Sequence, residues 1–306
     1  MASIQSYLVR GTLHLAKGVV IARKQHSEIG NLRRSFERAT RNLPMPGNVE
    51  VLHFKMNHIG AAWFTPSLGN SQRAMLFLHG GGYATGSINT AKSLVAKLAV
   101  ETGINILAIN YRLAPEQPFP AALEDAVAAY EYLLQQDYLP QNISIAGSSA
   151  GGGLVLATLL YLKDNNLPMP AAAVCLSPWT DLTGSGSSLK TNVVKDPVLI
   201  ARFMPQWAAR YATNQPLSHP YISPLFGNLQ GLPPLLLQVG THEILLDDSV
   251  RFAETARNHG VDVTLEVWQN MMHGWQLHWV YMPEAGHAIA NITRFLHRHL
   301  QEPDLS

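Results

Sequence analysis

The sequence predicts an α/β protein in which a mainly parallel central sheet is covered by helices on both faces. Between residues 75 and 268, short apolar runs alternate with longer runs of helical spacing. Such alternation requires crossover connections, and these make the strands of the sheet parallel. The first apolar run, Met75–Leu78, carries no polar residue, as expected of a strand that is buried on both faces.

The individual elements follow in order along the chain. We expect strands at residues 75–78, 105–109, 143–146, 172–176, 235–239 and 263–268. Helices are expected at residues 90–100, 121–136, 151–162 and 247–259. One or two earlier helices are predicted within residues 5–42 and end at Leu43-Pro44-Met45-Pro46-Gly47, a helix-breaking run. A polar loop at 185–188 and a helix within 190–215 interrupt the alternation, and they would lie above the carboxyl ends of the strands, where such sheets bind ligands.

The composition excludes several classes of protein. Apolar residues make up 47% of the 306-residue chain and charged residues 14%, which rules out a disordered protein. Lysine and arginine (22) balance aspartate and glutamate (21), so no nucleic-acid partner is expected. The one cysteine, Cys175, allows neither an internal disulfide nor a cysteine-based zinc site. The chain shows no secretory pattern and no run of the ~20 apolar residues that a membrane span needs, so we expect a cytoplasmic protein.

The pentapeptide Gly147-Ser148-Ser149-Ala150-Gly151 lies between a predicted strand and a predicted helix. This G-x-S-x-G pattern is typical of a nucleophile elbow, a tight turn whose flanking positions must lack side chains. Only Ser149 has glycine two positions away on both sides, whereas Ser148 does not. The pattern therefore predicts Ser149 as a nucleophile at a helix N-terminus, where N–H groups favour negative charge. A glycine-rich turn used only for packing is the alternative.

The run His79-Gly80-Gly81-Gly82 follows the first predicted strand. Acyl transfer needs N–H donors that point at the oxyanion of a tetrahedral intermediate, and glycines let the backbone approach that atom closely. We assign the N–H groups of Gly81 and Gly82 as donors, joined by that of Ala150. A tight turn and a phosphate cradle are the alternatives, and the cradle is disfavoured because no Gly-Lys-Ser/Thr follows. His79 is interpreted as a residue that holds the loop.

A serine nucleophile needs a base whose pKa lies near neutrality, and imidazole meets that need. The chain has 13 histidines, so a single histidine is weak evidence. His273 is selected by its position on the loop directly after the last predicted strand. In folds with a nucleophile elbow the triad residues follow in the order serine, acid, histidine, with the base on that loop.

The acid of the triad must then lie between Ser149 and His273, on the loop after strand 235–239. Glu243, Asp247 and Asp248 are the candidates. The two aspartates fall where the next helix begins, and acidic residues there commonly cap the helix or lie in its first turn. Glu243 is therefore favoured, and Asp247 and Asp248 stay open as alternatives.

These motifs resemble those of the bacterial hormone-sensitive-lipase-like (family IV) esterases of the α/β-hydrolase fold, over nearly the whole chain. His79–Gly82 matches the HGGG oxyanion motif of that family. Gly147–Gly152 matches its G-D-S-A-G-G motif, except that Ser148 replaces the aspartate. The segments Tyr111–Glu116 and Ser177–Leu182 are also similar to segments of the family.

The histidine and acid motifs carry the same resemblance with two departures. His273-Gly274 matches the family's histidine motif, but Trp275 stands where phenylalanine is usual. The commonest acid motif begins with Asp-Pro-Leu, and this chain has Glu243-Ile-Leu at the corresponding place. The chain thus resembles the branch in which a small polar residue replaces the elbow aspartate and glutamate is the acid.

The resemblance also implies how the chain is divided and how it assembles. Residues 1–45 and 185–215 would form a helical cap, and residues 46–184 and 216–306 a catalytic α/β-hydrolase domain. Homodimers would form through the last strand, 263–268, which is expected at a sheet edge where unpaired N–H and C=O groups invite pairing.

Together, the motifs predict a serine carboxylesterase that acts on small, short-chain acyl esters and needs neither a metal nor an organic cofactor. His273 would take the proton from Ser149, and Glu243 would orient the imidazole. A non-catalytic small-molecule-binding receptor on the same fold is the alternative from another class. Within the same chemistry, the bond that is cleaved could instead be that of an amide or a lactone.

Overall fold

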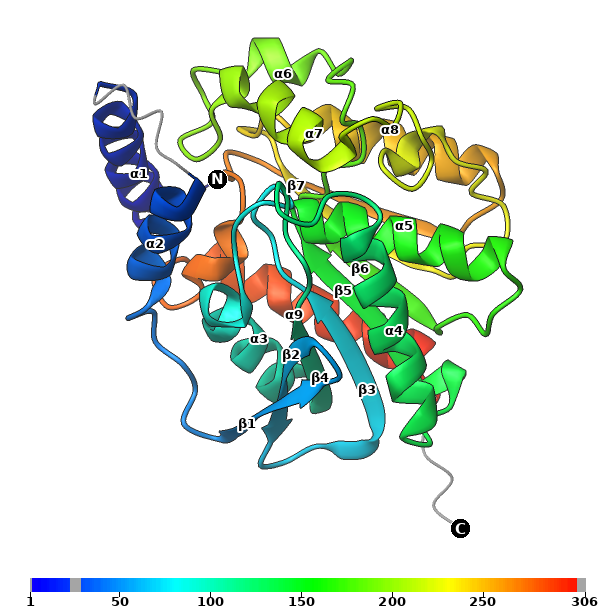
Figure 1. The fold of residues 1–306 in the computed structure, drawn as a ribbon. Helices are drawn as coiled ribbons and strands as arrows, with labels where there is room; N and C mark the ends of the chain where they lie inside the picture. Colours follow the sequence, from blue (N-terminus) through cyan, green and yellow to red (C-terminus); the bar gives the residue numbers. More distant parts are fainter. Residues whose placement is uncertain (1, 23–28, 302–306) are drawn as a thin grey trace.

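A single mixed sheet runs through the part of the chain that the computed structural model describes, residues 2–22 and 29–301. Its order is β1-β2-β4-β3-β5-β6-β7-β8 (Figure 1). The strands are β1 (Val49–Met56), β2 (Ile59–Pro66), β3 (Asn70–Leu78), β4 (Ile104–Asn110), β5 (Ile143–Ser148), β6 (Ala172–Leu176), β7 (Leu235–Gly240) and β8 (Val263–Trp268). The α-helices are α1 (Ile4–Ala22), α2 (Ile29–Thr40), α3 (Ile88–Thr102), α4 (Ala121–Gln135), α5 (Ala150–Asp164), α6 (Ser188–Thr191), α7 (Met204–Ala212), α8 (Leu246–Asn258) and α9 (Pro283–His299).

The six predicted strands are all present, and they form the parallel part of the sheet. Pairing is parallel from β4 through β3, β5, β6 and β7 to β8. The predicted α/β fold with a mainly parallel sheet is therefore confirmed. Strand β8 lies at one edge, as expected of the last strand, and β1 lies at the other.

The hairpin β1–β2 is absent from the prediction. It adds two antiparallel pairings, β1 with β2 and β2 with β4. The two strands join at Asn57-His58, where Asn57 has a φ of +53°, and this dipeptide is a much weaker hairpin signal than Asn-Gly. After Ile59, strand β2 continues with Gly60-Ala61-Ala62, residues that are depleted in strands. Hydrogen bonding to β4 therefore holds these residues in a strand that the local sequence does not predict.

Helices cover both faces of the sheet because strand side chains alternate between them. On β3, Met75 and Phe77 pack in one buried cluster with residues of α3 and α9. Leu76 and Leu78 point the other way, into a cluster with residues of α4, α5 and α8. The carboxyl ends of the parallel strands are thereby left for the loops that carry the predicted motifs.

Two groups of helices lie outside these layers. Helices α1 and α2 lie at the side of the sheet, and α6 and α7 lie above it (Figure 1). The single helix expected within residues 190–215 is instead the pair α6 and α7, since Pro197 interrupts the segment between them and Pro205 lies in the first turn of α7. Within residues 2–22 and 29–301, no helix is both long enough and apolar enough to cross a membrane.

Candidate active site

Ser149 stands at the tip of the turn between β5 and α5. Its φ of +55° and ψ of −123° are strained for a residue with a side chain, and such strain concentrates at functional turns. The turn is closed tightly by its glycines. A Cβ atom on Gly147 would lie 2.4 Å from the carbonyl oxygen of Gly151, and one on Gly151 would lie 2.1 Å from the carbonyl oxygen of Leu78. The geometry thus demands glycine on both sides of Ser149.

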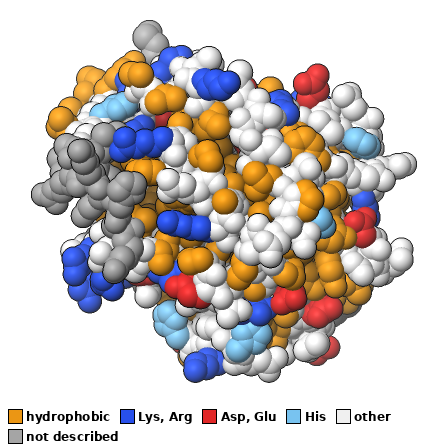
Figure 2. Space-filling model, turned by 45° about the horizontal axis from the view of Figure 1, so that its top comes forward, with side chains coloured by type: hydrophobic (Ala, Val, Ile, Leu, Met, Phe, Trp, Pro, Cys, Tyr) orange, Lys and Arg blue, Asp and Glu red, His pale blue; other side chains and the backbone are white. Residues whose placement is uncertain are grey.

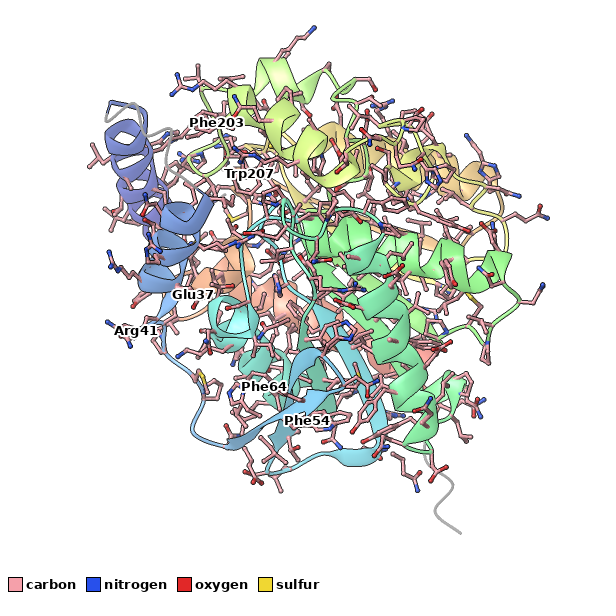
Figure 3. All side chains as sticks on the ribbon, viewed as in Figure 1. Glu37, Arg41, Phe54, Phe64, Phe203 and Trp207 are labelled. Atoms are coloured by element: carbon pink, nitrogen blue, oxygen red, sulfur yellow. The ribbon has the colours of Figure 1, made fainter. Side chains whose placement is uncertain are left out.

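The glycine loop after β3 lies against this turn. A Cβ atom on Gly80 would be 3.2 Å from the Cβ of Ser149. From above, Trp207 of α7 reaches down to the loop (Figure 3), so that a Cβ on Gly82 would fall 1.9 Å from Cε3 of the indole. Since Gly82 also has a φ of +60°, only glycine fits at this position.

Three backbone amides near Ser149 are free to donate. The N–H groups of Gly81 and Gly82 make no hydrogen bond within the described residues. The N–H of Ala150 begins helix α5 and has no partner inside the helix. These are the three groups that the sequence assigns to an oxyanion hole.

His79 supports the glycine loop from below. Its ring stacks on Tyr111 with centroids 4.2 Å apart, and its Nδ1 donates to the carbonyl oxygen of Gly80 at 2.8 Å. Burial lowers the pKa of His79 to about 4, against the opposing effect of that hydrogen bond, so the imidazole is neutral. The contacts support the interpretation of His79 as a residue that holds the loop.

The structure brings Glu243 and His273 into direct contact. Nδ1 of His273 lies 2.8 Å from Oε2 of Glu243. The other carboxylate oxygen, Oε1, accepts the amide of Gly240 at 2.6 Å and the hydroxyl of Ser177 at 2.8 Å. Glu243 is fully buried. Burial raises the pKa of its carboxyl, and the hydrogen bonds from His273, Gly240 and Ser177 oppose that rise.

One loop after β6 connects this pair to the elbow. Ser177 donates to Glu243, and the amide of Trp179 donates to the carbonyl oxygen of Ser149 at 3.0 Å. Among the described residues, no hydrogen bond joins the hydroxyl of Ser149 to His273. In a protein without bound substrate, catalytic hydrogen bonds are often long and tighten only when substrate binds.

Asp247 and Asp248 make no hydrogen bond to His273. Both lie in the first turn of α8, as predicted. Of the two expected roles, first-turn position is therefore the one they have; neither caps the helix, because their carboxylates accept amides of residues 180–188 and fasten that segment to α8. Asp248 accepts the amides of residues 180 and 181 at 2.9 Å each, and Asp247 accepts the amide of Ser188 at 2.9 Å. Buried peptide groups need such acceptors, and this need holds both carboxylates away from the imidazole.

Comparison with known proteins agrees with this geometry. A family model described as alpha/beta hydrolase fold matches residues 75–277. An acetyl-hydrolase of Streptomyces hygroscopicus is 40% identical over 300 residues, which are 97% of this chain and 97% of the relative. The crystal structure of an esterase from the bacterial hormone-sensitive lipase (HSL) family is 38% identical, with a TM-score of 0.93 over 98% of this chain and 100% of the other. The chain belongs to this family of α/β-hydrolases.

A third similar protein is EstE5, in a crystal that was soaked by p-nitrophenyl butyrate. It is 39% identical and has a TM-score of 0.90, covering 98% of this chain and 99% of the other. The predicted membership of the hormone-sensitive-lipase-like esterases is thus confirmed, and the protein is an enzyme that hydrolyses esters.

Two residues of the site in this esterase have no role in the sequence argument. Ser177 lies in a segment that resembles the family, yet nothing in its pattern reveals the hydrogen bond to Glu243. Trp207 lies more than a hundred positions after Gly82 in the chain, and no local pattern indicates that its indole covers that glycine. Both contacts arise only when distant segments meet.

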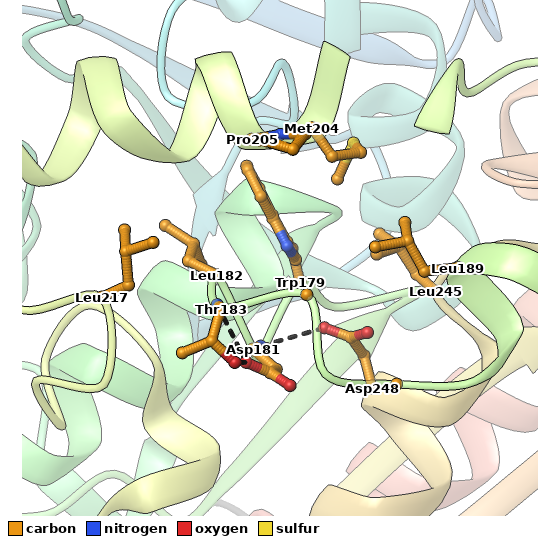
Figure 4. Close-up of a pocket in the computed structure, with 12 residues that line it drawn as sticks. Trp179, Asp181, Leu182, Thr183, Leu189, Met204, Pro205, Leu217, Leu245 and Asp248 are labelled. Atoms are coloured by element: carbon orange, nitrogen blue, oxygen red, sulfur yellow. Dashed lines mark hydrogen bonds between the residues drawn. The ribbon is translucent and has the colours of Figure 1, made fainter. Parts of the chain in front are cut away.

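A cavity of about 150 Å³ lies between α7 and the loop after β6 (Figure 4). Trp179, whose amide binds the carbonyl oxygen of Ser149, forms one wall, and Met204 of α7 lies on the opposite side. Leu182, Leu189, Leu217 and Leu245 make the lining largely apolar, with Asp181 and Asp248 at one end. An apolar space of roughly this size holds a molecule as large as benzene.

The surface above the cavity is mixed in character. Figure 2 shows apolar side chains between scattered cationic and anionic ones on the face that carries α6 and α7. In the described ranges, no group of three or more histidine, cysteine, aspartate or glutamate side chains is placed to hold a metal ion.

The electrostatics of His273 predict how activity depends on pH. Burial alone would lower the pKa of His273, but the hydrogen bond and charge of Glu243, with the charges of Asp196 and Asp248, raise it above its ordinary value. A protonated imidazole cannot accept a proton from serine. We therefore expect kcat/KM to fall on acidification, with a midpoint above pH ~6.5. Initial rates across about pH 5 to 8 measure this, and a flat profile there would exclude a histidine base.

Proposed function

We propose that this ester hydrolase is a serine carboxylesterase that cleaves short-chain acyl esters through an acyl-enzyme on Ser149. The observation that carries the proposal is the buried contact between His273 Nδ1 and Glu243 Oε2, at 2.8 Å. This contact leaves the other ring nitrogen, Nε2, as the proton acceptor. It also fixes the tautomer that a general base needs.

Each group then has a defined step. Ser149 Oγ attacks the ester carbonyl carbon while its proton passes to Nε2 of His273, and the negative charge of the tetrahedral intermediate develops on the carbonyl oxygen. The amides of Gly81, Gly82 and Ala150 stabilise that oxygen. Collapse of the intermediate breaks the bond to the alcohol, which leaves with the proton from His273. Water then attacks the acyl-enzyme, again with His273 as base, and releases the acid.

The cavity beside Trp179, the residue whose amide binds the carbonyl oxygen of Ser149, supports a preference for small acyl groups. A space of about 150 Å³ with a largely apolar lining suits a short acyl chain. The names of similar proteins point the same way. One relative is an acetyl-hydrolase, and a crystal of EstE5 was soaked by a butyrate ester.

The chain-length preference is tested with acetyl, butyryl, octanoyl and dodecanoyl esters of p-nitrophenol. We expect kcat/KM to be highest for the acetyl and butyryl esters and about 10-fold or more lower for the dodecanoyl ester, since forcing extra methylenes into a filled space costs free energy. A rate that rises steadily to the dodecanoyl ester would contradict the proposal. Matched amide and lactone substrates in the same series decide which bonds are cleaved, and the absence of turnover on every substrate would favour a receptor.

The same proposal includes the cap, formed by residues 1–45 and 185–215 over a catalytic domain of residues 46–184 and 216–306. Arg33 of α2 supports it, since its Nε donates to the carbonyl oxygen of Ala84 at 2.8 Å and its guanidinium pairs with Glu116 at 2.7 Å. Trp207 supports it from the second segment, through its contact with Gly82. Both segments thus touch the loop that carries the oxyanion donors.

We also propose a homodimer through the edge strand β8. Val267 of this strand is 39% exposed, and an edge strand with unpaired N–H and C=O groups is a ready partner for a second copy. Sedimentation velocity should give a particle of twice the 33.6 kDa chain mass. A 33.6 kDa particle at micromolar concentration would refute the dimer. A cytoplasmic location stays a prediction, which cell fractionation tests.

A further inference from the structure

Asp196 is a buried carboxylate for which the proposed chemistry gives no role. It lies between α6 and α7, and its side chain is fully buried. It has no salt-bridge partner among the described residues. Instead, Oδ1 accepts the amides of Val198 and Leu199 at 2.8 and 2.9 Å, and Oδ2 accepts the amide of Ile244 at 3.0 Å. The third of these contacts reaches the residue next to Glu243.

The same segment holds the other side of that peptide group. Nδ2 of Asn192 donates to the carbonyl oxygen of Glu243 at 2.8 Å. The carbonyl of Glu243 and the amide of Ile244 belong to one peptide unit, so Asn192 and Asp196 bind both of its polar groups. Because that unit is planar, two bonds at its opposite sides fix its orientation and therefore the direction in which the Glu243 side chain leaves the backbone.

Helix α1 secures the segment that delivers Asp196. Nζ of Lys17 donates to the carbonyl oxygen of Asp196 at 2.5 Å and to that of Leu199 at 2.7 Å. Arg10, two turns earlier on the same face of α1, lies 3.1 Å from His242 and donates to the carbonyl oxygen of Asn270. The helix thus touches both loops that carry the proposed acid and base.

We infer that Asp196 is a positioning residue for the esterase triad, which orients the peptide unit after Glu243 and places a second buried negative charge near His273. This inference rests on the proposed function, since it assigns Glu243 as the triad acid. The imidazole becomes positive while Ser149 attacks, and a fixed negative charge in a water-poor site stabilises that state.

Other charges around the pair set the sign of the effect. The carboxylates that act on His273 are Glu243, Asp196 and Asp248, and all three raise its pKa. The charge of Asp196 also raises the pKa of His14 and Lys17 on α1, and that of His242. The positive charges of Arg10 and Lys195 lower the pKa of His242. Removing the charge at position 196 lowers the pKa of His273, so the acid limb of the pH–rate profile moves to lower pH.

The test compares Asp196→Asn with Asp247→Asn. Both replace a carboxylate that binds backbone amides by its neutral isostere, and only Asp196 is among the charges that act on His273. We expect Asp196→Asn to lose about 10-fold to 100-fold in kcat with little change in KM, as for a displaced catalytic group. Its acid limb should shift to lower pH, whereas Asp247→Asn should keep the wild-type limb. A wild-type kcat in Asp196→Asn, or a loss of kcat with an unmoved limb, would overturn the inference.

A direct measurement removes the dependence on turnover. The His273 proton that faces Glu243 can be titrated by NMR in the Ser149→Ala background, where no acyl-enzyme forms. Adding Asp196→Asn should move that titration to lower pH, and an unchanged midpoint counts against the inference. If Asp196→Asn does not fold, Lys17→Gln tests the same inference. The hydrogen bonds of Lys17 go to backbone carbonyl oxygens of the segment that carries Asp196, so this variant should lower kcat at constant KM. A wild-type kcat in Lys17→Gln would reject the positioning role of this segment.

Glu243→Gln in the same assays separates this inference from the function on which it rests. If Glu243→Gln keeps its turnover, the proposed triad itself fails. If Glu243→Gln is inactive while Asp196→Asn behaves as wild type, the triad stands and only the positioning role of Asp196 is lost.

Discussion

Ser149→Ala should abolish ester hydrolysis while the protein folds normally. Removing a serine nucleophile costs on the order of 10⁶-fold in kcat, because the chemistry loses its covalent step. The residual rate is expected at roughly 10³-fold above that in water, from binding and oxyanion stabilisation alone. The strained φ of +55° at position 149 is no easier for alanine than for serine, so the melting temperature should change little. Initial rates on p-nitrophenyl butyrate and a thermal melt measure both quantities.

Ser148→Ala is the matched control for this experiment. Ser148 ends β5 directly before the turn and differs from Ser149 in lacking the two flanking glycines. It should keep most of its activity. An irreversible organophosphate should label Ser149, and peptide mapping locates the adduct. If Ser148→Ala were the inactive variant, or if the adduct lay elsewhere, the assignment of the nucleophile would be wrong.

The parts of the site that local sequence predicts are those with short-range steric causes. The elbow needs glycine at positions 147 and 151 because their Cβ atoms would strike backbone oxygens at 2.4 and 2.1 Å. Five consecutive residues therefore suffice to predict the elbow. The need for glycine at position 82 is also local, because a φ of +60° favours glycine whichever side chain covers it.

The parts that the sequence does not predict depend on contacts between distant segments. Lys17 of α1 binds the carbonyl oxygen of Asp196. In the sequence, the six strands β1 to β6 separate these two residues. Strand β2 is stabilised by pairing with β4 more than by the strand propensity of its own residues. The hydrogen bonds of Asp247 and Asp248 are not predicted for the same reason, because the amides that they accept belong to a loop far back in the chain.

The sequence offers three candidates for the acid of the triad. Position after β7 favours Glu243, and both aspartates stay open. The structure adds a physical distinction. Glu243 contacts Nδ1 of His273 at 2.8 Å, while the amides of residues 180, 181 and 188 occupy the two aspartates. Substitution of each of these three residues therefore tests which one is the acid of the triad.

Glu243→Gln should reduce turnover by about 10⁴-fold with little change in melting temperature. A carboxylate accepts the N–H at Nδ1 of His273 and stabilises the imidazolium that forms during attack. Glutamine keeps the shape of the side chain, but its amide can present N–H to the ring and select the wrong tautomer. Oε1 of a correctly turned glutamine can still accept from Gly240 and Ser177, which preserves the fold. The rate on p-nitrophenyl butyrate and a thermal melt report the two effects separately.

Asp247→Asn and Asp248→Asn complete the experiment and should keep most of their activity. Asparagine retains an oxygen for the amides that each aspartate accepts, so the loop stays attached to α8.

Burial raises the pKa of Asp248 to about 8. A group whose pKa is raised by folding stabilises the protein fully below its ordinary pKa, and it loses that contribution as the pH rises toward 8. Asp248→Asn should therefore flatten the decline in melting temperature between about pH 4 and 8, the interval between the ordinary and the raised pKa. Glu243→Asp should be impaired despite its charge, since a shorter side chain withdraws the carboxylate from His273. If either aspartate variant loses turnover while Glu243→Gln keeps it, the acid is not Glu243, and the contact at 2.8 Å only orients the loop.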